Sequence, residues 1–179
     1  HLVLAFIIIS LIFWILLNLK LNKHKKFLSN DKKSYIFYPL IILIYLQIMF
    51  GAFVSGLDAG RIYQTWPLMN YTYFPSDVVI LKAVDLFDFN NHGLIQFYHR
   101  NIAYIIFFYI LIIGFFIYKK DMQNLTKPFY LVASFLLLQV FLGIITLTTG
   151  LNIYLASGHQ ICGLLLTLSV INLYYHYIN

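Results

Sequence analysis

Five long runs of apolar residues, separated by polar segments, dominate the sequence. They cover residues 2–19, 35–54, 93–118, 128–149 and 156–177. Each run is close to the ~20 residues that a helix needs to cross the hydrocarbon layer of a bilayer. Backbone groups in that layer must find their hydrogen-bond partners within the segment, which favours helices over open strands. The pattern therefore predicts an all-α integral membrane protein with five transmembrane helices.

The polar segments between the runs differ in length and charge. Short basic loops tend to stay in the cytoplasm, so we expect the first and third loops there, the N-terminal end outside and the C-terminus inside. The segment 55–92 would then lie outside, and it is too long for a simple connector, which favours a functional role. The basic loop residues are Lys20, Lys23, Lys25, Lys26, Lys32, Lys33, Lys119, Lys120 and Lys127.

Composition agrees with a membrane protein. Hydrophobic residues make up 61% of the chain and charged residues only 10%, too few to cover a soluble globule. The net charge of +6 lies mainly in the loops, where it reports topology rather than a nucleic-acid partner. The single cysteine, Cys162, excludes an internal disulfide and a C-x-x-C-H covalent haem attachment.

Ionisable side chains lie at the outer mouths of three apolar runs. An ionisable residue at membrane depth is costly and by default marks a site. Counting ~1.5 Å per residue from the cytoplasmic ends, His1, His99 and His159 reach the same depth. Two imidazoles facing each other across a helix bundle can hold a haem iron; the alternative is that each is a satisfied helix-end residue. His92 belongs either to the outer loop or to the same cavity.

An internal repeat supports a bundle. The pattern L-Q-x-x-x-G occurs at residues 46–51 and 138–143, each time followed by an outer loop and a helix with a histidine near its start. Two such units predict an antiparallel four-helix bundle over residues 35–179. Residues 1–34 would be the last helix of an earlier bundle and a basic loop. We expect Gln47 and Gln139 to bond across helices, and Gly51 and Gly143 to allow close helix approach.

Three charged residues near these helices each have two interpretations. Arg100 either meets a haem propionate, for which its planar fork is suited, or anchors the helix at the lipid headgroups. Asp58 and Arg61, in the sequence GLDAGR, form either a functional pair or a helix-ending turn with solvated charges. The glycine content favours the turn.

Three ordered motifs are similar to those in the second half of haem A synthases of the bacterial and mitochondrial type. They are G-L-D-A-G-x-x-Y-x-T-W/F-P-x-M at residues 56–69, Q-F-x-H-R at 96–100, and L-Q-x-x-L-G-I-x-T at 138–146, with H-Q at 159–160. The resemblance covers the chain from about Gln47 onward. It implies eight helices in two homologous halves, with this chain holding the last helix of the first half and the whole second half.

The resemblance also implies roles for single residues. The histidine pair of the family's second half ligates a haem b, and it matches His99 and His159. His1 matches an axial ligand of the substrate haem O in the first half. The essential glutamate of the family also belongs to the first half, and this chain contains no glutamate. We therefore expect no catalytic residue in this chain, whose haem b would transfer electrons.

The activity implied is oxidation of the C8 methyl of haem O to the formyl of haem A, the cofactor of terminal oxidases. The implied setting is the bacterial inner membrane, rather than the mitochondrial one. The partners would be haem O, lipid, haem O synthase, oxidase assembly factors and further copies of the protein, and this piece alone would be inactive. Two other functions stay open: a bis-histidine haem b cytochrome without synthase activity, and a cofactor-free transporter or assembly module.

Overall fold

The computed structural model describes residues 1–28 and 35–178. Within these ranges the long helices are α1 (Leu2–Lys20), α2 (Tyr38–Gly56), α3 (His92–Lys119), α4 (Gln123–Thr148) and α5 (Ile153–Tyr177), with short 3-10 helices η2 (Ala59–Arg61) and η3 (Ala83–Phe87) between α2 and α3. All five long helices are long and apolar enough to cross a membrane, which confirms the predicted fold class. Two of the predicted loop lysines, Lys32 and Lys33, lie outside the described residues.

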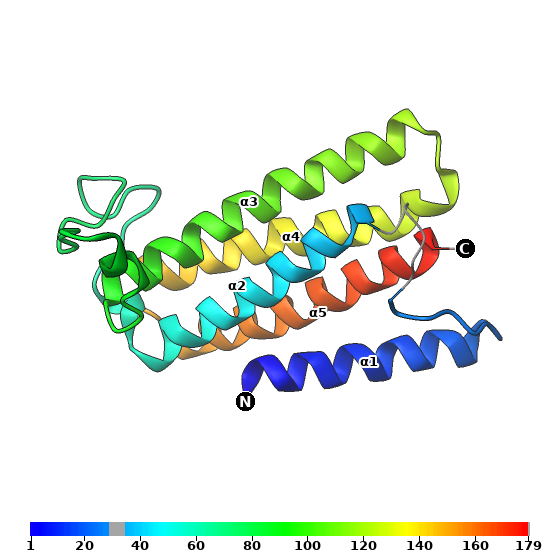
Figure 1. Cartoon of the computed structure of the whole chain (residues 1–179), viewed down its shortest axis with the longest axis horizontal. Coiled ribbons are helices and arrows are strands. Elements are labelled where there is room, and N and C mark those ends of the chain that lie inside the picture. Colours follow the sequence, from blue (N-terminus) through cyan, green and yellow to red (C-terminus); the bar gives the residue numbers. More distant parts are fainter. Residues whose placement is uncertain (29–34, 179) are drawn as a thin grey trace.

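Helices α2 to α5 form an antiparallel bundle (Figure 1). Each packs against the next along the chain, and α5 also contacts α2. This ring places α3 and α5 on opposite corners of the bundle. Helix α1 lies outside the ring against α5 and α2, and it begins at the same end as α3 and α5 (Figure 1). The predicted four-helix bundle with one leading helix is thus the observed architecture.

Helix α3 begins within one residue of its apolar run, and three other helices begin three or more residues away from theirs. Helix α4 begins at Gln123 and includes Pro128 in its second turn, where the proline removes one backbone hydrogen bond. Helix α5 begins at Ile153, because the side chain of Asn152 caps it by accepting a hydrogen bond from the backbone N–H of Tyr154 at 2.9 Å. Helix α2 begins three residues late and has a proline in its first turn.

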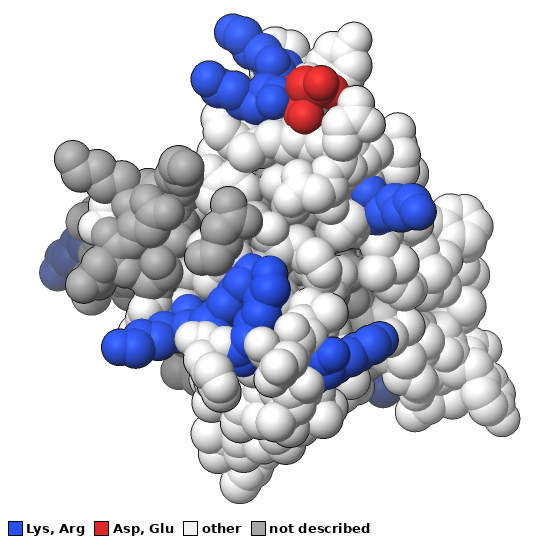
Figure 2. Space-filling view, turned by 90° about the vertical axis from the view of Figure 1, so that its right-hand side faces the viewer, with Lys and Arg blue, Asp and Glu red and all other residues white. Residues whose placement is uncertain are grey.

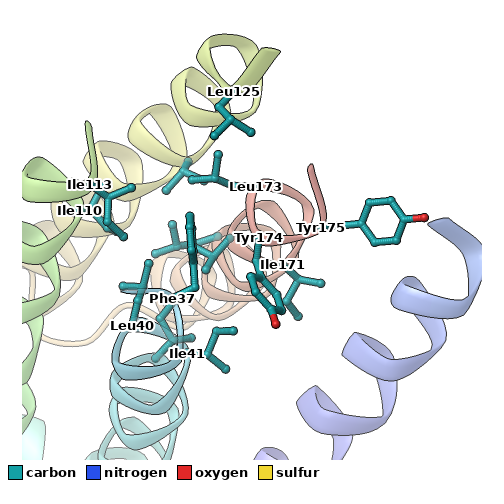
Figure 3. Close-up of a cluster of buried hydrophobic side chains, with 14 of the residues drawn as sticks. Phe37, Leu40, Ile41, Ile110, Ile113, Leu125, Ile171, Leu173, Tyr174 and Tyr175 are labelled. Atoms are coloured by element: carbon teal, nitrogen blue, oxygen red, sulfur yellow. The ribbon is translucent and has the colours of Figure 1, made fainter. Parts of the chain in front are cut away.

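The packed core fills the half of the bundle in which α3 and α5 end. Large side chains from four helices meet there (Figure 3), and Leu40, Ile110, Leu173 and Tyr174 are at most 1% exposed. Because lipid is as apolar as these side chains, close packing holds such helices together more than removal from water does. The opposite half of the bundle, which carries the candidate histidines, holds a smaller cluster of buried side chains, formed by Phe50, Ala59 and Ile95.

Helix α1 is attached to α5 through the residues that follow it. The ammonium group of Lys25 donates to the backbone carbonyl of Tyr175 at 2.8 Å and to that of Ile178, and lies 4.5 Å from the centre of the Tyr175 ring. The indole N–H of Trp14 donates to the carbonyl of Lys25 at 2.9 Å. Figure 3 shows Tyr175 pointing from α5 towards α1. A lysine suits this place because carbonyls at the C-terminal end of a helix lack intrahelical partners.

The two basic loops lie at one end of the bundle. Figure 2 views this end and shows basic side chains gathered on it, with a small acidic group at one edge. The loop after α1 and the turn between α3 and α4, which contains Asp121, both lie there. Their shared end agrees with the predicted arrangement. The side of the membrane that this end faces stays a prediction.

Candidate functional site

His99 on α3 lies against a glutamine and a glycine of α2. Its Nε2 is 3.3 Å from the amide nitrogen of Gln47. A Cβ atom added to Gly51 would lie only 3.2 Å from Cε1 of His99. Because Gln47 and Gly51 are four residues apart, they share one face of α2. We call these three residues the first cradle.

His159 on α5 lies in the same way against α4. Its Nε2 is 3.2 Å from the amide nitrogen of Gln139, and its Nδ1 is 3.1 Å from the backbone carbonyl oxygen of the same residue. A Cβ atom added to Gly143 would lie 3.0 Å from Cε1 of His159. These three residues form the second cradle, and the sequence repeat is therefore also a repeat in space.

The cradles confirm one prediction and refine another. Gln47 and Gln139 do bond across helices, and in each case the partner is the histidine of the following helix. The two glycines were expected to let helices approach, but their missing side chains leave room for an imidazole. Sequence spacing alone could not show this, because it does not tell which helix faces the L-Q-x-x-x-G surface.

The contacts of His159 determine which ring nitrogen carries the proton and which carries the lone pair. A carbonyl only accepts hydrogen bonds, so Nδ1 of His159 carries the proton and donates to Gln139. Its Nε2 then accepts from the amide of the Gln139 side chain. An Nδ1–H group held by a backbone carbonyl, with Nε2 left as the ligand atom, is the usual arrangement of a metal-binding histidine.

The two cradles each hold one imidazole near the end of the bundle at which α3 and α5 begin. The two histidines stand on helices at opposite corners of the bundle. His99 and His159 are half-buried, unlike the core below them. Buried polar atoms there lack a hydrogen-bond partner among the described residues: Oε1 of Gln47, Oε1 of Gln139 and Nδ1 of His99. Two imidazoles are what a six-coordinate haem iron uses as axial ligands, so these residues fit a haem.

The outer segment is held over the first cradle by two other residues of α3. The side-chain amide of Gln96 donates to the carbonyl of Tyr63 at 2.9 Å, and Arg100 donates to the same carbonyl at 3.0 Å and to that of Leu68 at 3.3 Å. The Nε–H of Arg100 is buried without a partner in the described part of the chain. Sequence reasoning missed these hydrogen bonds between α3 and the outer segment. The signal was the four-residue spacing within Q-F-x-H-R, which puts both side chains on one helix face.

Further contacts order the start of the outer segment. Tyr63 donates its hydroxyl proton to the carboxylate of Asp77. That carboxylate lies against Gly93 in the first turn of α3, and a Cβ there would clash with it. A negative charge is favourable at the N-terminus of a helix. Asp58 and Arg61 form an exposed ion pair at 3.6 Å within a turn, which agrees with the turn interpretation.

The remaining predicted residues lie outside the cradles. His1 is exposed at the start of α1 and makes no capping hydrogen bond with its side chain. His92 is exposed as the first residue of α3. Cys162 is buried, with its sulfur 3.6 Å from the carbonyl oxygen of Phe135, as expected of a small apolar residue. The haem O contact expected of His1 and the propionate contact expected of Arg100 stay predictions.

Comparison with known proteins shows to which family the chain belongs. Residues 1–171 match the family model described as cytochrome oxidase assembly protein, COX15-CtaA. The chain belongs to this family. The match includes both cradles and the outer segment between α2 and α3. No solved structure matches the chain.

Several curated relatives of the chain are named heme A synthase. The relative from Pelagibacter ubique (strain HTCC1062) is 44% identical over 169 residues, which are 94% of this chain and 48% of that protein. The relative from Wolbachia pipientis wMel is 34% identical over 168 residues, 93% of this chain and 46% of that protein. The relative from Rickettsia massiliae (strain Mtu5) is 34% identical over 173 residues, 96% of this chain and 51% of that protein. The chain thus spans about half the length of the curated relatives it matches.

Proposed function

We propose that this chain is the haem b half of a haem A synthase and that His99 and His159 are the axial ligands of that haem. The observation that carries the proposal is the pair of cradles, which present two imidazoles from opposite corners of one bundle. The names of the curated relatives support the same activity. The proposed reaction of the whole protein is oxidation of the C8 methyl of haem O to the formyl of haem A.

In this proposal the chain supplies electron transfer and not the oxidising site. A haem with two imidazole ligands has no open axial position and therefore serves electron transfer. The cradles bind and orient the ligands, and the core below them excludes water. His1 would contact haem O outside this bundle, and the Nε–H of Arg100 would meet a propionate of the haem b. The catalytic glutamate would belong to the other half of the protein.

The proposed function also predicts where in the cell the protein lies. The protein would be multi-pass in a bacterial inner membrane, with the lysine-rich end of the bundle in the cytoplasm. Residues 35–179 would form the haem b bundle, and residues 1–34 would belong to the neighbouring bundle and the basic loop. Haem O synthase and oxidase assembly factors would be its partners, as suits a family of cytochrome oxidase assembly proteins.

Absorption spectra test the proposal directly. The purified chain, reconstituted with haem b, should show low-spin bands that His99→Ala and His159→Ala each abolish. His176→Ala is the control, because His176 lies near the far end of α5 and bonds to Asn172. A chain that takes up no haem would contradict the proposal and favour a transporter or assembly module.

Haem A formation tests the wider activity. We expect cells that produce the whole protein to form haem A, and cells that produce only these 179 residues to form none. Haem A made by the 179 residues alone would contradict the proposed division of labour. A whole protein that binds haem b but forms no haem A would favour a membrane cytochrome.

A further inference from the structure

The outer connections of the two helix pairs touch each other at Gly60 and Leu151. Gly60 lies in η2, in the segment that follows α2, and Leu151 lies in the turn that joins α4 to α5. Gly60 is buried, and a Cβ atom added to it would lie 3.0 Å and 3.2 Å from the two methyl carbons of Leu151. The isobutyl group of Leu151 therefore fills the space in which any other residue at position 60 would carry its side chain.

The short helix η2 contacts both pairs through neighbouring residues. Ala59 is 0% exposed and forms a cluster with Phe50 of α2 and Ile95 of α3, whereas the next residue, Gly60, meets Leu151. The buried residues of this outer cluster all belong to the α2–α3 pair and its connection, while the larger core farther inside draws on all five long helices. The contact between Gly60 and Leu151 therefore joins the two pairs at their outer end.

The backbone around Leu151 is closely defined. The N–H of Gly150 donates to the carbonyl of Leu147 at 3.4 Å, and the N–H of Leu151 donates to that of Thr146 at 2.9 Å, which is the Schellman arrangement at a helix C-terminus. Gly150 has a φ of 75°, as this motif requires, but Leu151 also has a positive φ, of 63°, which is uncommon for a residue with a side chain. Such strain persists where the surroundings fix it, and the contact with Gly60 does so for Leu151.

This contact lies on the outer side of the two cradles. Both connections are at the end of the bundle at which α3 and α5 begin (Figure 1), and His99 and His159 lie about two helical turns inside that end. Two imidazoles can bind one iron only if the helices that carry them keep a fixed separation.

We propose that Leu151 is a positioning residue that packs against Gly60, fixes the separation of the two helix pairs at their outer end, and so aligns His99 and His159 for one haem iron. The alignment for haem rests on the proposed function. The contact that joins the two pairs is a property of the chain without haem, so it can be tested separately.

The test exchanges the side chain across the contact. Leu151→Gly removes the isobutyl group, and glycine adopts a positive φ without strain. Gly60→Val places side-chain atoms where the isobutyl group lies. The double variant Gly60→Val/Leu151→Gly fills the same space from the other side. Gly56→Val is the matched control, because a Cβ atom at Gly56 meets nothing within 4 Å.

Axial ligation in the full chain, reconstituted with ferric haem b, is the first readout. An imidazole that is out of line leaves part of the iron five-coordinate and high-spin, a change that a loss of stability alone would not produce. We expect a high-spin fraction in each single variant, and low-spin spectra in the double variant and in Gly56→Val. Low-spin spectra in both single variants, or a larger high-spin fraction in the double variant than in either, would overturn the proposal.

The rate at which haem is lost to apomyoglobin is the second readout. Leu151 is half-buried, so haem loss should be about three- to tenfold faster in Leu151→Gly, as expected for a half-buried leucine that loses its contact. The double variant should lose haem nearly as slowly as the wild-type chain. Leu151→Ala repeats the comparison if Leu151→Gly does not fold, because it removes the same methyl groups.

Amide hydrogen exchange in the chain without haem separates this proposal from the proposed function. In each single variant, residues 57–62 and 149–152 should both open more easily, and the double variant should restore their protection. If only the mutated segment changes, the two connections are not joined and the proposal fails. If both segments change together but the wild-type chain takes up no haem, the proposed function fails while the role of Leu151 in joining the two pairs stands.

Discussion

The α2–α3 pair and the α4–α5 pair share a glutamine, a glycine and a histidine at matching places, but they differ in what joins the helices. In the first pair the ring of His99 lies against Gln47, and a long outer segment between the helices is held by Gln96 and Arg100. In the second pair the ring of His159 lies against Gln139 in the same way, and α4 and α5 are joined by a short turn at Gly150.

The comparison shows how one repeat can serve two different surroundings. A glutamine and a glycine four positions apart are enough to build a place for an imidazole in either pair. In the first pair the helix that carries His99 also carries Gln96 and Arg100, which hold the outer segment. In the second pair the described residues of α5 have no such segment to hold.

The largest difference between the pairs is expected when the glycines are filled. Added side-chain atoms in a tight site cost about 1–3 kcal/mol, so Gly143→Val should weaken haem binding by about tenfold or more. Gly51→Val should have a smaller effect, because a Cβ there lies farther from the imidazole, at 3.2 Å compared with 3.0 Å. Titration of each variant with haem b measures both effects.

The control for this prediction is Gly158→Ala. A Cβ atom at Gly158 meets nothing within 4 Å, so haem binding should stay unchanged while the helix gains about 0.5–1 kcal/mol. Equal losses of haem binding in Gly51→Val and Gly143→Val would contradict the difference expected from the two Cβ distances.

A smaller effect is expected from weakening the hydrogen bonds that hold the outer segment to α3. The α4–α5 pair has no such segment among the described residues. Arg100→Lys replaces a guanidinium that reaches the carbonyls of Tyr63 and Leu68 by a single ammonium group. Hydrogen bonds to charged groups contribute about 1.5–3 kcal/mol each, so local opening of residues 57–75 should become easier by about that amount. Amide hydrogen exchange measures the opening.

The α4–α5 pair should be unaffected by this change. Exchange in α5 should be the same in Arg100→Lys and in the wild-type chain, and haem bands that depend on His159 should persist. Faster exchange throughout the bundle would mean that Arg100 stabilises the whole fold, and the distinction between the two pairs would fail.

The smallest effect concerns the attachment of α1 to the second pair. Lys25, in the loop after α1, makes this attachment to the end of α5. Lys25→Met removes the ammonium group from the carbonyls of Tyr175 and Ile178. We expect a loss of about 1 kcal/mol, as for an ordinary intramolecular hydrogen bond, seen as easier proteolysis of the loop after α1. Equal proteolysis of the two proteins would contradict this role.

The same lysine gives a pH dependence. Burial, with Lys23 nearby, lowers the pKa of Lys25 below its ordinary 10.5. Between the folded and unfolded pKa values the unfolded chain binds more protons, so the free energy of unfolding rises with pH in that window. Thermal unfolding of wild type and Lys25→Met at several alkaline pH values should show this rise only in the wild type.

The sequence predicts the fold well, because spans and loops are local properties. Apolar length predicts the five helices, and the L-Q-x-x-x-G repeat predicts their pairing. The start of α4 was misplaced because a proline is most often found in the first turn of a helix, whereas Pro128 lies one turn further in. Helix-end signals such as Asn152 decide the true start of α5.

The site was predicted less completely, because contacts between distant segments leave little trace in sequence. The histidines and glutamines could be chosen, since polar residues at membrane depth are rare. The contact of Arg100 with the carbonyl of Tyr63 could not be predicted, since any backbone carbonyl can be the acceptor. Lys25 was interpreted only as a topological charge, because nothing in the loop sequence shows that it reaches the end of α5.

The central claim is that the two cradles together supply both axial ligands of one haem. Electron paramagnetic resonance of the ferric, reconstituted chain tests it most directly, with His99→Gly and His159→Gly as variants. We predict a bis-imidazole low-spin signal in the wild type, its loss in each variant, and its return when free imidazole fills the vacated position. A bis-imidazole signal that persists in either variant without added imidazole would contradict the claim.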